Sequence, residues 1–324
     1  MPRQSDTLVP PAQQPRPDDY GYDLAAALRA VVGIRSLVPE DAFTAGTLGT
    51  ERAGHGVFIR EGVALTIGYL TTEAETIWIT LADGRVVPGH SLAYDQETGF
   101  GLVQALTRLD IPPVPLGQSA AVPVGTRVVL AGAGGRRNAV AARVTAKQEF
   151  AGYWEYVLDE AIFTTPAHPF WGGAALFGPA GDLLGIASLQ IEQSGEGGSG
   201  DVMNMVVPID LLTPILDDLL TRGRTTNPPR PWLGLFATEV DGSVLVLGLA
   251  EGGPAEQAGL RVQDRVLSVA GMSVDGLAGF FRRIWEVGPA GVEVPLKIER
   301  DGRRLDRRIA SSARERFLKA PRLH

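Results

Sequence analysis

Short β-rich runs separated by glycine turns are the feature that most constrains the fold of this chain. Residues 56–59 and 63–66 are apolar runs joined by the pair Glu61-Gly62, an arrangement that predicts a β-hairpin. Comparable runs recur along the sequence, which contains 40 Gly and 23 Pro among its 324 residues. The sequence therefore predicts a mainly β protein, long enough to divide into two or three domains.

Three longer segments have a recognisable order and spacing. The first ends in Thr66-Ile67-Gly68-Tyr69-Leu70, the second contains Thr98-Gly99-Phe100-Gly101-Leu102, and the third is Pro169-Phe170-Trp171-Gly172-Gly173. Over roughly residues 30–309 the chain resembles the high-temperature-requirement (HtrA) family of serine proteases. The resemblance implies a chymotrypsin-like double β-barrel followed by one PDZ domain of the α+β class.

The same resemblance assigns the positions of the catalytic machinery. The family's catalytic His, Asp and Ser fall on Tyr69, Gly99 and Trp171, and a glycine whose N–H belongs to the oxyanion hole falls on Pro169. Trp171 has no nucleophilic atom, Tyr69 is a poor base near neutrality and Gly99 has no side chain. Proline lacks the N–H donor. The sequence predicts a pseudoprotease rather than an enzyme, without catalytic residues, that binds polypeptide as adaptor, scaffold or chaperone.

Two alternatives remain open. The chain could be an active serine endopeptidase whose catalytic residues lie elsewhere, because geometry and not sequence order defines a triad. Its base would be His55, His90, His168 or His324, and a cysteine nucleophile is excluded because the chain has no Cys. It could also be a regulatory subunit that joins an active paralogue in a mixed oligomer.

A second domain is expected after a helix over residues 209–221 and a Pro-containing linker at 223–231. Trp232-Leu233-Gly234-Leu235 resembles the PDZ loop that holds a terminal carboxylate, and Gly253-Pro254-Ala255 with Asp264 matches later PDZ motifs. Residues 235–238 are expected to present free backbone groups to an added peptide strand, beside a helix that begins at 275 or 276. The predicted peptide-binding residues are Trp232, Leu233, Gly234, Leu235, Phe236, Leu277, Phe281 and Trp285.

These assignments divide the chain into a disordered Pro-rich N-terminus (1–19), a trypsin-like domain (20–222), the linker, a PDZ domain (232–312) and a basic tail (313–324). A short helix is expected within 19–30. Tyr20 and Tyr22 lie where family members trimerise, although such tyrosines can also pack on their own domain. Without a signal peptide or an apolar run of about 18–20 residues, the chain is expected to be cytoplasmic, or periplasmic if its start is mis-assigned.

Composition sets further limits. The net charge of −7 argues against a general nucleic-acid binder. The absence of Cys excludes disulfides and thiolate metal sites, and no phosphate-binding Gly loop or metal-ligand spacing is present. No metal or cofactor is predicted, and the expected partners are polypeptides.

Overall fold

The computed structural model describes residues 9–193 and 201–319, which form two compact units. The larger unit contains the described residues up to Gln148, Glu160–Thr225 and Lys319. The second contains Glu149–Asp159 and Thr226–Leu318. The division between Thr225 and Thr226 lies inside the range 223–231 expected for the linker, but the inclusion of Glu149–Asp159 in the second unit has no counterpart in the sequence pattern.

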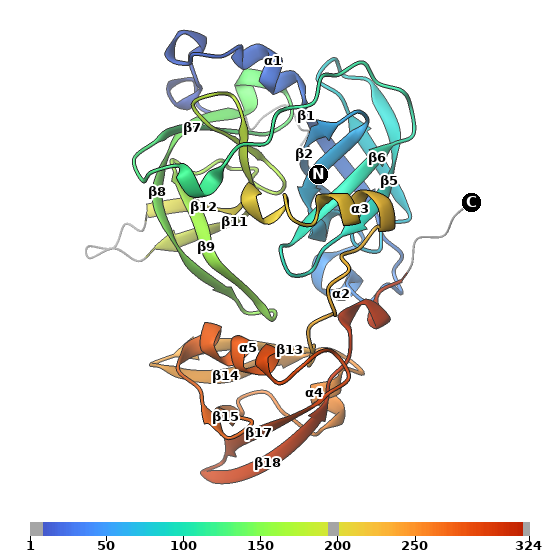
Figure 1. The fold of residues 1–324 in the computed structure, drawn as a ribbon, viewed down its shortest axis with the longest axis vertical. Helices are drawn as coiled ribbons and strands as arrows, with labels where there is room; N and C mark the ends of the chain where they lie inside the picture. The colour runs from blue at the N-terminus through green and yellow to red at the C-terminus, as the bar shows by residue number, and fades with distance from the viewer. Residues whose placement is uncertain (1–8, 194–200, 320–324) are drawn as a thin grey trace. The chain divides into compact units, whose positions relative to one another are not determined.

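The first half of the larger unit is a closed β-barrel, drawn in blue to cyan in Figure 1. Its strands, in spatial order, are β1 (Val31–Leu37), β2 (Glu51–Arg60), β3 (Val63–Ile67), β6 (Phe100–Ala105), β5 (Val86–Tyr94) and β4 (Thr76–Thr80), and β4 pairs with β1. Burial alternates along β4, as expected for a strand with one face inward. Phe58, Ile79 and Val103 fill the interior. Gly62, with φ of 69°, makes the predicted β2–β3 turn.

A second closed barrel follows, drawn mainly in green (Figure 1). Its strands, in spatial order, are β10 (Ala175–Phe177), β11 (Leu183–Gln193), β12 (Asp201–Pro208), β9 (Tyr156–Thr165), β8 (Ala139–Gly152) and β7 (Arg127–Ala131). Leu130, Val140, Leu176 and Val206 are buried in its core. β8 and β9 are long strands that extend as a hairpin (Figure 1), and the hairpin tip supplies the residues that belong to the second unit.

Short helical segments connect and cover the barrels. They are η1 (Pro11–Gln13), η2 (Pro17–Asp19), α1 (Leu24–Arg29), α2 (Ala45–Leu48), η3 (Gly68–Leu70), η4 (Ser119–Ala121), η5 (Gly135–Asn138), η6 (Ile209–Leu211) and α3 (Leu216–Arg222). The helix expected over 209–221 is therefore two segments, η6 and α3, separated by a turn. Gly223, with φ of 72°, ends α3 as a left-handed cap.

The prediction of a disordered N-terminus over residues 1–19 is wrong from Val9 onward. Val9 is fully buried in the core of the second barrel, and its backbone N–H donates to the Arg137 carbonyl at 3.1 Å. Burial of one apolar side chain and two proline-started turns fixes this stretch although its composition is polar. Residues 1–8 lie outside the described part of the chain.

The second unit is built on an antiparallel sheet with the order β13 (Leu235–Val240), β14 (Ser243–Leu249), β15 (Arg265–Val269), β17 (Glu293–Arg300) and β18 (Arg303–Ala310), and β16 (Met272–Ser273) pairs with β15. Helices α4 (Pro254–Gln257), α5 (Gly276–Glu286) and η7 (Arg314–Phe317) complete it. Phe280, Phe281 and Ile284 bury one face of α5 in the core. The predicted fold class, a mainly β double barrel followed by a PDZ domain, is confirmed.

Candidate functional site

The positions predicted to replace a catalytic His and Ser meet at one backbone carbonyl. Tyr69 lies in η3, directly after β3, and Trp171 lies in the loop before β10. The Tyr69 hydroxyl donates to the Ser188 carbonyl oxygen at 3.0 Å, and Trp171 Nε1 donates to the same oxygen at 3.1 Å. The β11–β12 register shifts between Ala187 and Leu189, so Ser188 lies at a bulge. The two side chains therefore satisfy a carbonyl outside the regular ladder.

Glycine 99 lies beside the same turn. The Gly68 N–H donates to the Gly99 carbonyl at 2.7 Å, and Gly99 has φ of 80°. The neighbouring carboxylate, Asp95, accepts from the backbone N–H and the hydroxyl of Thr98 at 2.8 and 2.7 Å. Asp95 thus caps the turn that leads into β6, a structural role of the kind that Asx turns perform.

The loop around Trp171 is held close to β2 by a glycine. A Cβ on Gly173, which has φ of 80°, would lie 1.9 Å from the His55 carbonyl oxygen. The His55 N–H also donates to the Gly172 carbonyl at 2.8 Å. This close approach and the positive φ are the reasons that a side chain does not fit at Gly173. Pro169, in the same loop, is exposed.

Electrostatics keep the side chains near this site neutral. Burial raises the pKa of the Tyr69 phenol above its ordinary value of 10.0. Burial, with the neighbouring His168, lowers the pKa of His55 to about 4, and burial also lowers that of His168. The two imidazole rings lie 6.1 Å apart, centroid to centroid. Both rings are therefore uncharged near pH 7.

The hydrogen bonds of these histidines are to backbone groups. His55 Nδ1 accepts the Ala133 N–H at 3.1 Å, and His168 Nδ1 accepts the Phe170 N–H at 3.0 Å. His168 Nε2 is 2.9 Å from the Asn138 carbonyl oxygen. These bonds assign the ring proton of each neutral histidine to Nε2. Within residues 9–193 and 201–319, His55 Nε2 is buried without a hydrogen-bond partner.

A second site lies in the PDZ domain, at the loop that the sequence predicts to hold a carboxylate. The backbone N–H groups of Leu233, Gly234 and Leu235 point at Glu155 Oε1, at 3.2, 2.8 and 3.1 Å. Leu233 N–H also lies 3.1 Å from Glu155 Oε2. The loop therefore has the geometry of a carboxylate-binding nest, with several donors converging on one anionic group.

Glu155 is not among the binding residues that the sequence predicts. It lies in the β8–β9 turn, some 78 to 80 residues before its partners, and nothing in Tyr153-Trp154-Glu155-Tyr156 marks it as a ligand. Its presence corrects the expectation that residues 235–238 present free backbone groups. Leu235 N–H bonds Glu155, and Ala237 N–H donates to the Tyr153 carbonyl at 2.9 Å.

The remaining predicted peptide-binding residues lie around this loop and along α5. Trp232 packs its ring on Phe317, with centroids 4.8 Å apart, and Phe236 is half-buried against Tyr153. Phe281 is fully buried in the core, and Trp285 stacks on it. The role of all these residues in binding a peptide stays a prediction.

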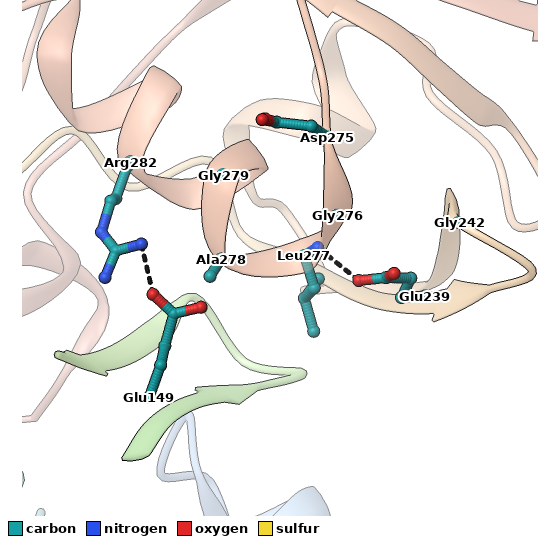
Figure 2. Close-up of a pocket in the computed structure, with 9 residues that line it drawn as sticks. All are labelled: Glu149, Glu239, Gly242, Asp275, Gly276, Leu277, Ala278, Gly279 and Arg282. Carbon is teal, nitrogen blue, oxygen red and sulfur yellow. Dashed lines mark hydrogen bonds and ion pairs between the residues drawn. The ribbon is translucent and has the colours of Figure 1, made fainter. Parts of the chain in front are cut away.

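Leu277 borders an open pocket at the other end of α5. The pocket, of about 580 Å³, is lined by Glu149, Glu239, Gly242, Asp275, Gly276, Leu277, Ala278, Gly279 and Arg282. Figure 2 shows Glu239 aimed at the start of α5, where its carboxylate accepts the Leu277 N–H at 2.9 Å. Arg282 reaches from the same helix to Glu149 of the hairpin tip (Figure 2). The pocket therefore lies at the N-terminal end of α5, and neither Glu155 nor the carboxylate loop lines it.

The described residues contain neither a candidate metal cluster nor a helix that could span a membrane. Among residues 9–193 and 201–319, no group of three or more His, Asp or Glu side chains is placed to hold a metal ion. In the same part of the chain, every helix is too short or too polar to cross a membrane.

Comparison with known proteins agrees with this architecture. The family model of the trypsin-like peptidase domain matches residues 54–186, and that of the PDZ domain matches residues 231–310. Serine endoprotease DegS of Salmonella typhimurium is 24% identical over 312 residues, which are 89% of this chain and 84% of that protein. A probable periplasmic DegP-like serine endoprotease of Halomonas elongata is 28% identical over 268 residues. The match covers 77% of this chain and 54% of the Halomonas protein, so the chain spans about half of that relative.

Solved structures show the same fold. The HtrA-type protease AlgW with a decapeptide superposes with a TM-score of 0.53 at 20% identity, and the match covers 92% of this chain and 99% of that one.

These relatives correct one prediction. They are named serine endoproteases, which contradicts the prediction of an inactive pseudoprotease and non-enzyme and fits better the alternative of an active serine endopeptidase. The prediction rested on elimination at motif positions, whereas a triad is defined by the geometry of its groups. The assignment of Tyr69, Gly99, Trp171 and Pro169 to triad and oxyanion positions stays a prediction. With a trypsin-like peptidase domain followed by a PDZ domain, the chain belongs to the HtrA-like family.

Proposed function

We propose that this chain is a serine endopeptidase that acts on polypeptides and that its PDZ domain recognises a polypeptide carboxylate. The observation that carries the recognition step is the convergence of three N–H groups, from Leu233, Gly234 and Leu235, on one carboxylate. A chain terminus presents the same chemical group, and its preceding residues can add beside β13 as a strand. The substrate class is therefore polypeptide.

The cleavage step is supported by the names of the relatives and by the barrel pair that they share with this chain. Serine catalysis needs a hydroxyl nucleophile, a base and donors for the oxyanion. Trp171 offers neither a hydroxyl nucleophile nor a base, so the nucleophile of this proposed enzyme is another residue. The experiment must accordingly follow the reaction itself and then locate the residue that reacts.

The test has two parts. Purified protein is incubated with unfolded casein, and fragments are followed by mass spectrometry. A fluorophosphonate probe then labels the activated serine, and peptide mapping identifies its position. Cleavage with a mapped label supports the proposal. Intact casein and an unlabelled protein would refute the endopeptidase step.

Substitutions at the motif positions give the matched comparison. Trp171→Ser alone, and the set Tyr69→His, Gly99→Asp, Pro169→Gly and Trp171→Ser, are assayed beside the wild type. Activity that first appears in the fourfold variant would refute the proposal, because it would show that the wild type lacks the chemistry. Equal activity in wild type and Trp171→Ser would agree with a nucleophile elsewhere.

Assembly is a separate part of the proposal. We propose a homotrimer, the assembly that the resemblance to the family implies. Tyr20 and Tyr22 lie 5.7 Å apart, ring to ring, and both are half-buried. Sedimentation velocity measures the mass of the assembly, and a monomer across micromolar concentrations would refute this part.

A further inference from the structure

The tip of the β8–β9 hairpin lies in the PDZ groove in the manner of a bound peptide. Glu155 supplies a carboxylate to the loop, and Tyr153, two residues earlier, supplies a carbonyl to the Ala237 N–H at 2.9 Å. As the tip runs back from Glu155 to Tyr153, its partners run forward from Leu235 to Ala237. That is the antiparallel direction in which a peptide terminus adds to a sheet edge.

The edge of β13 that receives the tip is the one left open by the sheet. β13 pairs with β14 on its other side, with Ala237 opposite Val246. Because an unpaired strand edge exposes N–H and C=O groups, it is a template for an added segment. The Tyr153 carbonyl satisfies one of these groups, and the Tyr153 ring lies 6.0 Å from the Phe236 ring.

Side chains on both strands of the tip hold it in place. Val157 is 8% exposed and belongs to the core cluster of this unit. Arg282 of α5 pairs with Glu149 at 2.5 Å and with Asp159 at 2.6 Å, one carboxylate from each strand. Glu155 itself is 6% exposed and adopts a left-handed conformation with φ of 60°. Such a conformation is unfavourable in a residue other than Gly, so the surrounding contacts hold it.

We propose that residues 153–157 are an internal ligand of the PDZ groove, and that a polypeptide ending in a free carboxylate binds only by displacing Glu155 from the loop. The two carboxylates need the same three N–H groups, so they cannot be bound together. This inference rests on the proposed recognition of polypeptide carboxylates and adds its regulation: the groove is closed by the chain's own acidic turn until a competing terminus is present.

The size of the effect follows from the population of the docked tip. A ligand whose site is free in a fraction of the molecules binds with its affinity reduced by that fraction. A tethered segment acts at an effective concentration of order millimolar, so a tip of micromolar intrinsic affinity would occupy the groove in nearly all molecules. Removing the Glu155 carboxylate should strengthen peptide binding by about tenfold or more.

The experiment uses the full chain and two readouts. Amide hydrogen exchange, read by mass spectrometry over residues 233–237, reports whether the tip covers the loop. Fluorescence anisotropy with a labelled random decapeptide pool reports binding, with one pool ending in a free carboxylate and the other amidated. The variants are Glu155→Ala and the isosteric Glu155→Gln, which keeps one carbonyl acceptor. Glu160→Ala is the control, because Glu160 lies on the same hairpin but pairs with Lys147.

The expected result is faster exchange at 233–237 and at least tenfold tighter binding of the free-carboxylate pool in Glu155→Ala. Glu155→Gln should show a smaller change in the same direction, and Glu160→Ala should match wild type. Exchange over β17 and β18 checks that the domain remains folded. Unchanged exchange at 233–237 in Glu155→Ala would overturn the docking.

Two further outcomes are distinguishable. Faster exchange with unaltered, measurable peptide affinity would overturn the competition. If exchange is faster but no variant binds either pool, carboxylate recognition by the PDZ domain fails, and the regulation built on it fails with it. The exchange data separate that outcome from a hairpin that never docked.

Discussion

Raising the pH should weaken the docking of the hairpin tip in the carboxylate loop. Burial raises the pKa of the Glu155 carboxyl from 4.5 to about 7, although the N–H groups of Leu235, Leu233 and Gly234 and the positive charge of Arg314 act in the opposite direction. A tip released into water regains an ordinary carboxyl pKa. Between the two values the docked state binds a proton that the released state has lost.

The sign and size of the effect follow from this difference. Since the pKa is higher in the docked state, docking is strongest below about pH 4.5 and weakens as the pH rises to about 7, above which it is constant. A difference of about two and a half pKa units corresponds to about 3 kcal/mol, or roughly three-hundredfold in the docking equilibrium. The loop is therefore free of the tip in a larger fraction of molecules at the higher pH.

The assay is amide exchange at residues 233–237 between about pH 5 and about pH 8. Intrinsic exchange rates also change with pH, so protection in the wild type is divided at each pH by protection in Glu155→Gln, whose amide does not titrate. This ratio should fall as the pH rises. A ratio that stays constant, or that rises with pH, would refute the reasoning.

Three other substitutions test contacts described above. Arg282→Ala should weaken the docking free energy of the tip by no more than about 1 kcal/mol, because the ion pairs of Arg282 with Glu149 and Asp159 are solvent-exposed. A loss of exchange protection at 233–237 of more than about tenfold would contradict this. Asp264→Asn should lower the free energy of unfolding of the PDZ domain by about 3 kcal/mol, because Asp264 is fully buried and Arg300 donates to both its oxygens at 2.6 Å. Chemical denaturation measures this loss, and a loss below about 0.5 kcal/mol would contradict the importance of the ion pair. Tyr69→Phe and Trp171→Phe should each cost about 1 kcal/mol and together more than their sum, because only the double variant leaves the Ser188 carbonyl without either donor; strict additivity in thermal unfolding would show that the two donors act independently.

The fold could be predicted from sequence because its signals are local. The Glu61-Gly62 pair lies between two apolar runs and forms the expected hairpin of β2 and β3. The stripe of Phe280, Phe281 and Ile284 defines the buried face of α5 in the same way. The helix expected over 209–221 shows the limit of this approach, because an apolar stripe does not reveal the turn that separates η6 from α3.

The candidate sites depend on contacts between distant residues, which a single sequence does not reveal. The three sequence segments predicted that positions 69 and 171 belong to one site, and in the structure both side chains donate to the Ser188 carbonyl. Nothing in the sequence marks the bulge that turns this carbonyl toward them. Function was predicted least well. Familiar side chains are absent at the motif positions, but their absence does not exclude a catalytic site, because other residues can form the same geometry.

The contacts of the hairpin tip are of two kinds, which determines how the PDZ groove would respond to pH. The Glu155 carboxylate titrates, whereas the Tyr153 carbonyl, the buried Val157 side chain and the backbone edge of β13 do not. Above about pH 7 the second group of contacts is undiminished, so the tip should still dock, only less tightly. At high pH the tip would therefore still occupy the groove but would be easier to displace, and a peptide would still be required to release it.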